Sequence, residues 1–311
     1  MHHVVIIGCG DIGRRVAKRW LAEGGRCNTP EDARPDLRAG VQVSALARSP
    51  DSAERLTGLG IAPVAGDLDQ PETLHALGTA GVLLYYFAPP PGSGTIDRRM
   101  RAFLATRREA NAPARIVYIS TSGVYGDHAG ALVDESTPPA PQSDRSRRRL
   151  DAEDQLRAWC ELHGMPLVIL RVGGIYGPGR LPVERIRAAT PVLREELAPT
   201  TNRIHSEDLA DICMAAGRPG APDGVFNVAD EHAGNMTEYF YAVADALGLP
   251  RPPAVDWNEA KNVLSKVILS YLNESRRLDT CRLREVLGVS LRYPDLGAGL
   301  SASVEAEPKG D

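Results

Sequence analysis

The sequence predicts an α/β fold in which a doubly wound parallel sheet is joined to a smaller C-terminal substrate lobe. Strand-like and helix-like segments alternate through the first 170 residues, a pattern that is typical of βαβ units. The alternation becomes irregular after residue 177. A chain of 311 residues, 43% of them hydrophobic, is long enough for about two domains.

Short apolar runs predict six strands in the first part of the chain. They cover residues 4–7, 40–49, 61–68, 81–90, 114–126 and 165–177. The run GVLLYYFAPP has no charged residue and ends in prolines, which indicates a strand that is buried on both faces and stops there. Helices are expected between these strands, with right-handed crossovers.

The later elements are less regular. We expect a helix-like run at 182–199 broken by Pro191, a helix at 205–217, a strand at 224–230, a helix at 237–249 and two further helical stretches. From about Ser301 the chain becomes polar, and we expect a disordered tail there.

The first strand leads directly into a glycine-rich turn, GCGDIG, and then into an amphipathic helix. Gly8, Gly10 and Gly13 have the G-x-G-x-x-G spacing: the first permits the tight turn, the second lets the backbone approach a ligand, and the third allows close helix–strand packing. A helix N-terminus offers free N–H groups to phosphate. This pattern predicts a Rossmann-type pyrophosphate site, the alternative being a tight turn without a ligand.

Residues 1–170 are therefore expected to form an NAD(P)-binding Rossmann domain, and 171–300 mainly a substrate lobe, with 203–230 returning to the first domain and 301–311 forming the tail. The stretch at 26–39 is rich in proline and charge, and it is too long for an ordinary helix-to-strand link. We interpret it as a surface insertion, and a tolerated loop is the preferred interpretation over a functional lid.

Composition excludes several other classes of protein. The net charge of -4 gives no reason to expect nucleic acid, and no apolar run approaches the length of a membrane span. The five cysteines are scattered without a C-x-x-C pair, so neither a metal site nor a disulfide framework is expected. Because a strand begins at Val4 with no cationic leader before it, we expect a cytoplasmic protein.

Several motifs occur in an order that resembles a known superfamily. They are GCGDIG at 8–13, GDL at 66–68, STSGVYG at 120–126, ILRVGGIYGPG at 169–179, RIHSEDLA at 203–210 and VFNVAD at 225–230. The chain resembles the extended short-chain dehydrogenase/reductase superfamily, in its NAD(P)-dependent epimerase/dehydratase group. YYFAPPPGSG at 85–94 is similar to an atypical subgroup.

This resemblance implies roles for individual residues. The implied cofactor-binding residues are Gly8, Gly10, Asp11, Ile12 and Gly13 at the pyrophosphate, Asp67 and Leu68 at the adenine, Ala88 and Pro89 near the nicotinamide, and Gly173. Thr121 matches the catalytic Ser/Thr, whose hydroxyl can hydrogen-bond a substrate oxygen. The alternative for Thr121 is a strand-end hydroxyl that caps local backbone.

The end of the second strand predicts the cofactor. An acidic residue there binds the ribose 2′-OH of NAD, whereas an arginine accommodates the 2′-phosphate of NADP. The segment ALARS offers Arg48 and no acid, so we predict NADP in preference to NAD. The alternative is that Arg48 is an ordinary surface residue.

The sequence departs from the family where a Tyr-x-x-x-Lys pair is expected. Arg145 and Arg149 fall at these positions, and an arginine cannot relay protons as a tyrosine does. Helical spacing places both on the apolar stripe that includes Ala152 and Leu156. They therefore need anions: a cofactor phosphate, a substrate carboxylate or Glu153. An Arg149–Glu153 pair at the edge of the stripe is the competing interpretation.

Two functional hypotheses follow. The first is an NADP-dependent oxidoreductase or epimerase-like enzyme acting on a small substrate, for which an anionic molecule is one candidate. Thr121 would then polarise the substrate, and Tyr125, Tyr86 or water would exchange the proton. The second is a non-catalytic NADP(H)-binding protein or redox sensor that lacks the Tyr-x-x-x-Lys pair. A homodimer is the default assembly that the superfamily implies.

Overall fold

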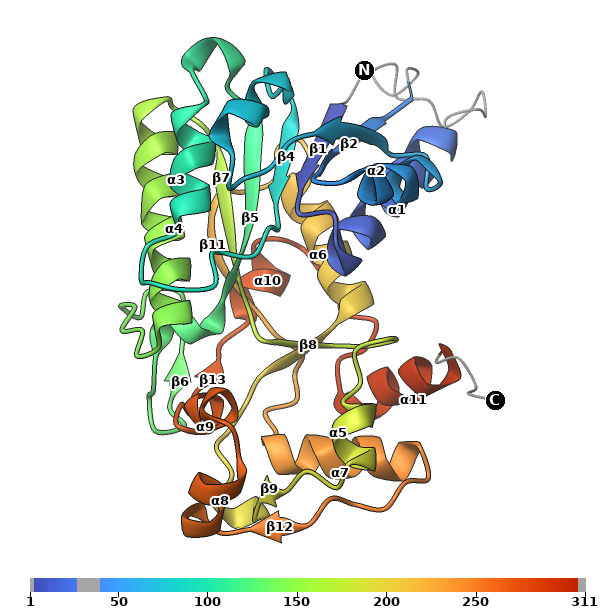
Figure 1. Ribbon diagram of the computed structural model, residues 1–311, viewed down its shortest axis with the longest axis vertical. Coiled ribbons are helices and arrows are strands. Elements are labelled where there is room, and N and C mark those ends of the chain that lie inside the picture. The colour runs from blue at the N-terminus through green and yellow to red at the C-terminus, as the bar shows by residue number, and fades with distance from the viewer. Residues whose placement is uncertain (1–2, 27–39, 307–311) are drawn as a thin grey trace. The chain divides into compact units, whose positions relative to one another are not determined.

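The computed structural model of the chain describes residues 3–26 and 40–306 (Figure 1). Except for Arg26, the predicted insertion at 26–39 lies outside the described residues. The chain divides into two compact units. Unit 1 comprises Met1–Ser120, Arg147–Leu170 and Ala210–Val225, and unit 2 comprises Thr121–Ser146, Arg171–Leu209 and Phe226–Asp311.

A seven-stranded sheet confirms the predicted α/β fold. Its order is β3-β2-β1-β4-β5-β7-β11. The strands are β1 (His3–Ile7), β2 (Gln42–Ala47), β3 (Ala62–Ala65), β4 (Leu83–Tyr86), β5 (Arg115–Thr121), β7 (Leu167–Val172) and β11 (Gly224–Val228). Val4 of β1 pairs in parallel with Val43 on one side and Leu83 on the other. The chain therefore winds outward from β1 in both directions, as in a Rossmann sheet.

Helices cover both faces of the sheet in unit 1. They are α1 (Asp11–Arg26), α2 (Pro50–Thr57), α3 (Arg98–Ala105), α4 (Asp144–Leu162) and α6 (Ser206–Gly217), with short 3₁₀ turns η2 (Pro71–Ala76) and η3 (Glu109–Asn111). Alternation along β4 shows the two faces. Tyr86 packs in a core with Phe103 of α3 and Leu156 of α4, whereas the hydroxyl of Tyr85 accepts from Trp20 of α1.

Two predicted strands end earlier than expected. The strand predicted at 114–126 stops at Thr121, and Ser122–Tyr125 form a 3₁₀ turn, η4. The strand predicted at 165–177 divides at Gly173 into β7 and β8 (Gly174–Tyr176). The backbone at Gly173 passes close to that of Asn202: a Cβ on Gly173 would lie 2.7 Å from the Asn202 carbonyl oxygen. After this point the chain leaves the main sheet, and β8 pairs with β10 (Arg203–His205).

Unit 2 contains short strands and helices. The strands are β6 (Leu132–Val133), β8, β9 (Val192–Leu193), β10, β12 (Ala254–Val255) and β13 (Arg277–Leu278). The helices are α5 (Val183–Arg187), η5 (Glu195–Leu197), α7 (Met236–Ala246), α8 (Trp257–Val263), α9 (Lys266–Leu272), α10 (Cys281–Glu285) and α11 (Leu296–Ala306). Tyr176, Phe240 and Leu300 belong to one of its cores.

The observed units refine the predicted division of the chain. Residues 121–146, which the sequence placed in the first domain, belong to unit 2, and the predicted return at 203–230 corresponds to Ala210–Val225 in unit 1. The predicted disordered tail is wrong for residues 301–306, because buried Leu300 and Ser303 anchor the end of α11. Residues 307–311 lie outside the described part. Across 3–26 and 40–306, the helices are too short or too polar to span a membrane.

Candidate functional site

The glycine-rich turn of unit 1 has the geometry of a phosphate loop. Gly8 has a φ of 89°, and a Cβ there would lie 2.4 Å from the backbone nitrogen of Ala88. Only glycine lets the ends of β1 and β4 approach so closely. At Gly10, by contrast, a Cβ would meet nothing within 4 Å. The space above Gly10 is thus open to a ligand, as the motif predicts.

The N-terminus of α1 follows this turn. The Gly10 N–H donates to the Gly8 carbonyl at 2.8 Å, and the helix begins at Asp11. Ile12 is buried and anchors the first turn, so the first amides of α1 are held in place and have no earlier carbonyl in the helix to bind. Burial raises the pKa of the Cys9 thiol to about 11, which keeps it protonated. These residues fit a pyrophosphate bound by backbone N–H groups.

Arg99 connects the two loops that were predicted to contact the rest of the cofactor. Its guanidinium donates to both carboxylate oxygens of Asp69, at 2.8 and 2.6 Å, and to the Pro89 carbonyl at 3.2 Å. Asp69 directly follows Asp67 and Leu68, and Leu68 is buried. A single bidentate side chain therefore fixes the spacing between the 67–69 loop and the 88–89 loop.

Arg48 follows β2 directly and is exposed. The next residue, Ser49, caps α2 by accepting from the Ser52 N–H at 3.3 Å. The hydrogen bond from Arg99 lowers the pKa of Asp69, and the charge of Arg48 makes a smaller contribution in the same direction. Asp69 thus stays ionised near Arg48, but its carboxylate is already bound by Arg99.

Arg149 lies in unit 1, where it binds neutral oxygens. Its Nη1 donates to the Ala88 carbonyl at 3.3 Å, the Tyr118 hydroxyl at 3.2 Å and the Ile119 carbonyl at 3.3 Å. Burial raises the pKa of Tyr118 to about 12, although Arg149 opposes this shift. The half-buried guanidinium therefore joins β4, β5 and α4. Glu153 pairs with Arg157 at 3.0 Å and accepts from Ser120 at 2.5 Å.

Unit 2 contains a pocket of about 340 Å³. Its lining is Thr121, Ser122, Gly123, Arg145, Ser146, Val172, Gly173, Gly174, Ile175, Arg180, Thr200, Thr201, Asn202, Arg203, Met236, Tyr271, Glu274 and Arg276. These described residues include four arginines and one carboxylate, so the pocket carries positive charge. Three of the predicted site residues meet here: Thr121, Arg145 and Gly173.

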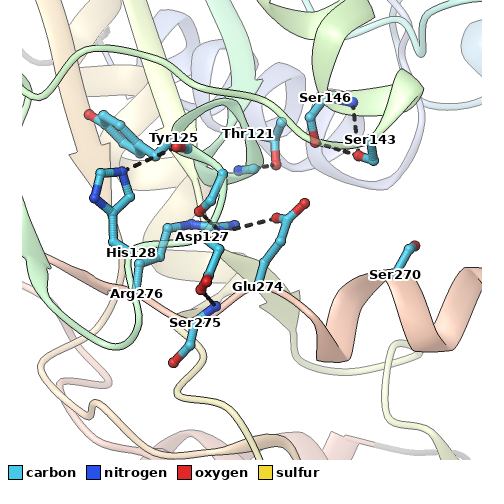
Figure 2. A network of polar contacts seen from close by, with 12 residues as sticks. Thr121, Tyr125, Asp127, His128, Ser143, Ser146, Ser270, Glu274, Ser275 and Arg276 are labelled. Atoms are coloured by element: carbon cyan, nitrogen blue, oxygen red, sulfur yellow. Dashed lines mark hydrogen bonds and ion pairs between the residues drawn. The ribbon is translucent and has the colours of Figure 1, made fainter.

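Thr121 precedes the η4 turn and lines this pocket. Figure 2 shows it beside the polar network of Glu274 and Arg276. Its Oγ1 accepts from the Gly123 N–H at 3.2 Å, so the local capping role considered from the sequence is present. The turn packs tightly against the start of α4, since a Cβ on Gly123 would lie 2.7 Å from Ser146 Oγ. Capping leaves the hydroxyl proton of Thr121 available for another acceptor.

Arg145 contacts helix α9 of the same unit. Its Nη1 donates to Ser270 Oγ at 2.6 Å, and its guanidinium carbon lies 3.6 Å from the ring centroid of Tyr271. A hydroxyl and an aromatic face are neutral partners, so neither cancels the charge that Arg145 brings to the pocket.

Glu274 and Arg276 were not found from the sequence. Glu274 is 7% and Arg276 9% exposed, and their Oε2 and Nη1 atoms are 3.0 Å apart. Arg276 Nη1 also donates to the Gly126 carbonyl at 2.6 Å. The stretch NESRR has no recognisable spacing, and only the tertiary structure brings it beside Thr121 and Arg145.

The two tyrosines considered as proton donors have other surroundings. The hydroxyl of Tyr125 is buried and donates to Asn227 Oδ1 at 2.8 Å, while its ring lies 4.7 Å from the Arg171 guanidinium. Tyr125 is outside the pocket lining given above. Tyr86, in unit 1, is also buried, and burial raises its pKa well above the ordinary value. Neither environment favours proton exchange with a ligand.

Comparison with known sequences finds a family model that matches the middle of the chain and a relative that matches most of it. The profile of the NAD dependent epimerase/dehydratase family matches residues 98–229. The chain is also 23% identical to Protein YeeZ of Escherichia coli K12 over 299 residues, which cover 95% of this chain and 97% of that protein. The similarity to YeeZ thus extends through both units.

Solved structures give the same result for the fold. A functionally unknown conserved protein from Silicibacter pomeroyi superposes with a TM-score of 0.74 and 29% identity, covering 98% of this chain and 99% of its own. UDP-glucuronic acid 4-epimerase from Bacillus cereus, solved in complex with NAD, superposes with a TM-score of 0.71 and 16% identity, with 98% of each chain covered.

Proposed function

Because residues 98–229 match the profile of the NAD dependent epimerase/dehydratase family, we propose that the chain is an NADP(H)-using enzyme of the oxidoreductase or epimerase type that acts on a small anionic substrate. The cofactor would accept or return a hydride at the substrate carbon. The residues of this chain would bind both molecules and polarise the substrate oxygen. A homodimer and a cytoplasmic location stay predictions.

The glycine-rich turn and the N-terminus of α1 support the cofactor part of this proposal. The open space over Gly10 and the amides that follow Asp11 suit a pyrophosphate. Arg48 would bind the 2′-phosphate of NADP, since it is exposed at the end of β2, where NAD-specific proteins carry an acid. The B. cereus epimerase was solved with NAD, so the preference for NADP is particular to this proposal.

The pocket of unit 2 supports the part of this proposal that concerns the substrate. The single observation that supports it best is the presence of Arg145, Arg203 and Arg276 around Thr121, with Glu274 as the carboxylate among the described lining residues. A cationic pocket raises the local concentration of anionic ligands and orients them. In this proposal Thr121 donates its hydroxyl proton to the substrate oxygen, and the arginines bind the anionic group.

Replacement of Thr121 tests this role. We expect Thr121→Val to lower turnover by roughly 10²-fold or more, because it removes a hydrogen-bond donor at the reacting oxygen. NADPH affinity should stay unchanged. Turnover is followed by NADPH absorbance over a panel of hydroxy and oxo acids. Thr121→Ser, which keeps the hydroxyl, is the matched control, and full activity in Thr121→Val would refute the role.

A non-catalytic NADP(H) sensor is the second candidate. The contacts of Arg149 favour it, because the residue at the position of the family lysine bridges β4, β5 and α4. A sensor should change conformation or partner binding between NADPH and NADP⁺ without turnover. Identical proteolysis patterns with the two redox forms would eliminate this candidate.

A further inference from the structure

We propose that Glu274 exchanges the proton in the reaction, in place of the tyrosine that this chain lacks. This inference rests on the proposed function, because it assumes that an anionic substrate binds in the pocket of unit 2. Arginine, serine, threonine and asparagine side chains do not exchange protons near neutral pH, and among the described lining residues only Glu274 and Tyr271 are left.

Burial and anchoring favour Glu274 over Tyr271. Glu274 is 7% exposed, whereas Tyr271 is 48% exposed. The chain after Glu274 is fixed at several points: the Ser275 N–H donates to Asp127 at 2.8 Å, and the Ser275 hydroxyl accepts from the Thr200 N–H at 3.1 Å. A buried carboxylate on an anchored segment keeps one position, as proton transfer requires.

The two carboxylate oxygens have different surroundings. Oε2 is 3.0 Å from Arg276 Nη1, and within the described part of the chain Oε1 has no hydrogen-bond partner. In Figure 2 a dashed line joins the carboxylate to Arg276. Arg276 therefore orients Glu274 through one oxygen, which leaves the other for a ligand.

In the proposed step Glu274 exchanges a proton with the reacting oxygen of the substrate. When the substrate is an alcohol, its O–H bond breaks and the proton forms a new O–H bond on Glu274 Oε1, while the oxygen becomes a carbonyl. A bound oxidised nicotinamide cofactor would supply the hydride acceptor for the same carbon, and its reduced form would supply the hydride in the reverse direction. Thr121 donates a hydrogen bond to that oxygen throughout.

Other groups near Glu274 influence its protonation. The charged or titratable side chains around it are Arg276 on its own segment, Asp127 and His128 on the loop after η4, Arg145 on α4, Tyr271 on α9, Arg180 after β8 and Arg203 on β10. An anion bound in the pocket would offset part of the positive charge of these arginines.

Sulfate binding to the NADP⁺-saturated protein tests this inference without the natural substrate. Sulfate stays a dianion across roughly pH 5 to 8, so it supplies no proton itself. Calorimetry in two buffers of different ionisation enthalpy counts the protons that accompany binding. We expect wild-type protein to take up a fraction of a proton per sulfate at the acidic end, and sulfate affinity to rise as the pH falls.

Glu274→Gln should abolish this proton uptake and make sulfate affinity independent of pH. Because a negative charge is removed, the variant should also bind sulfate at least about threefold more tightly at neutral pH. Tyr271→Phe is the matched control and should keep the uptake. Uptake that persists in Glu274→Gln, or that disappears in Tyr271→Phe, overturns the role of Glu274. Sulfate binding without proton uptake overturns it as well. If wild-type protein binds no sulfate, the anion pocket itself fails, and the proposed function fails with it.

Discussion

The two units of the molecule use their arginines differently. In unit 1, Arg107 donates to the Leu77 and Leu74 carbonyls at 2.6 and 2.7 Å, and Arg149 donates to two further carbonyls. These side chains join elements of the fold. In unit 2, Arg145 and Arg276 line a pocket and contact an aromatic ring and a carboxylate. The glycine-rich turn of unit 1 thus leaves backbone open to a ligand, whereas the pocket of unit 2 is lined by charged side chains.

The largest expected effect tests the backbone of unit 1. Gly8→Ala forces a φ of 89° on a residue with a Cβ and places that Cβ 2.4 Å from Ala88 N. We expect the free energy of unfolding to fall by about 3 kcal/mol or more, as measured by urea denaturation.

Gly10→Ala is the matched control for this change, because its Cβ meets nothing within 4 Å. We expect its stability to change by less than about 1 kcal/mol while NADPH affinity falls at least about tenfold, since the methyl group fills the space over the loop. If Gly10→Ala bound NADPH normally, the ligand would not lie over this turn.

This difference between the units explains what the sequence could predict. A glycine-rich turn is local: Gly8, Gly10 and Gly13 are close in sequence, and the strand and helix around them are recognisable. The fold class and the strand–turn–helix arrangement were therefore predictable, and phosphate binding at this turn stays a prediction. Glu274 lies about 150 residues after Thr121, in a stretch without periodicity or motif, and the two line one pocket only through tertiary folding. Likewise, the strand break at Gly173 could not be predicted from the sequence, because it depends on a contact with Asn202.

The second expected effect compares two arginines of helix α4. Arg149→Met removes the donor from three oxygens, and we expect it to lower the free energy of unfolding by about 2–3 kcal/mol. Arg145→Met removes one hydrogen bond and one ring contact, so we expect a loss of about 1 kcal/mol or less but clearly weaker sulfate binding. Equal destabilisation by the two changes in urea denaturation would contradict the division of roles.

A smaller effect concerns a buried carboxyl in unit 2. Burial raises the pKa of Asp230 from its ordinary value of 3.8 to about 7. Between these values the folded state holds a proton that the unfolded state releases, so this group's contribution to stability is present below about pH 4 and is lost as the pH rises through 7. We expect Asp230→Asn to stabilise the protein by on the order of 1–2 kcal/mol at pH 8 and by little at pH 4. Denaturation at the two pH values checks this, and equal effects at both would exclude the raised pKa.

The central claim is that the backbone loop of unit 1 and Arg48 together bind NADP(H). A calorimetric titration of the purified protein with NADPH and with NADH, side by side, tests it most directly. We expect NADPH to bind at least about tenfold more tightly, and Arg48→Asp to remove most of that difference by weakening NADPH alone. Equal affinity for the two cofactors, or an equal effect of Arg48→Asp on both, would contradict the account, and binding of neither would remove the cofactor from it.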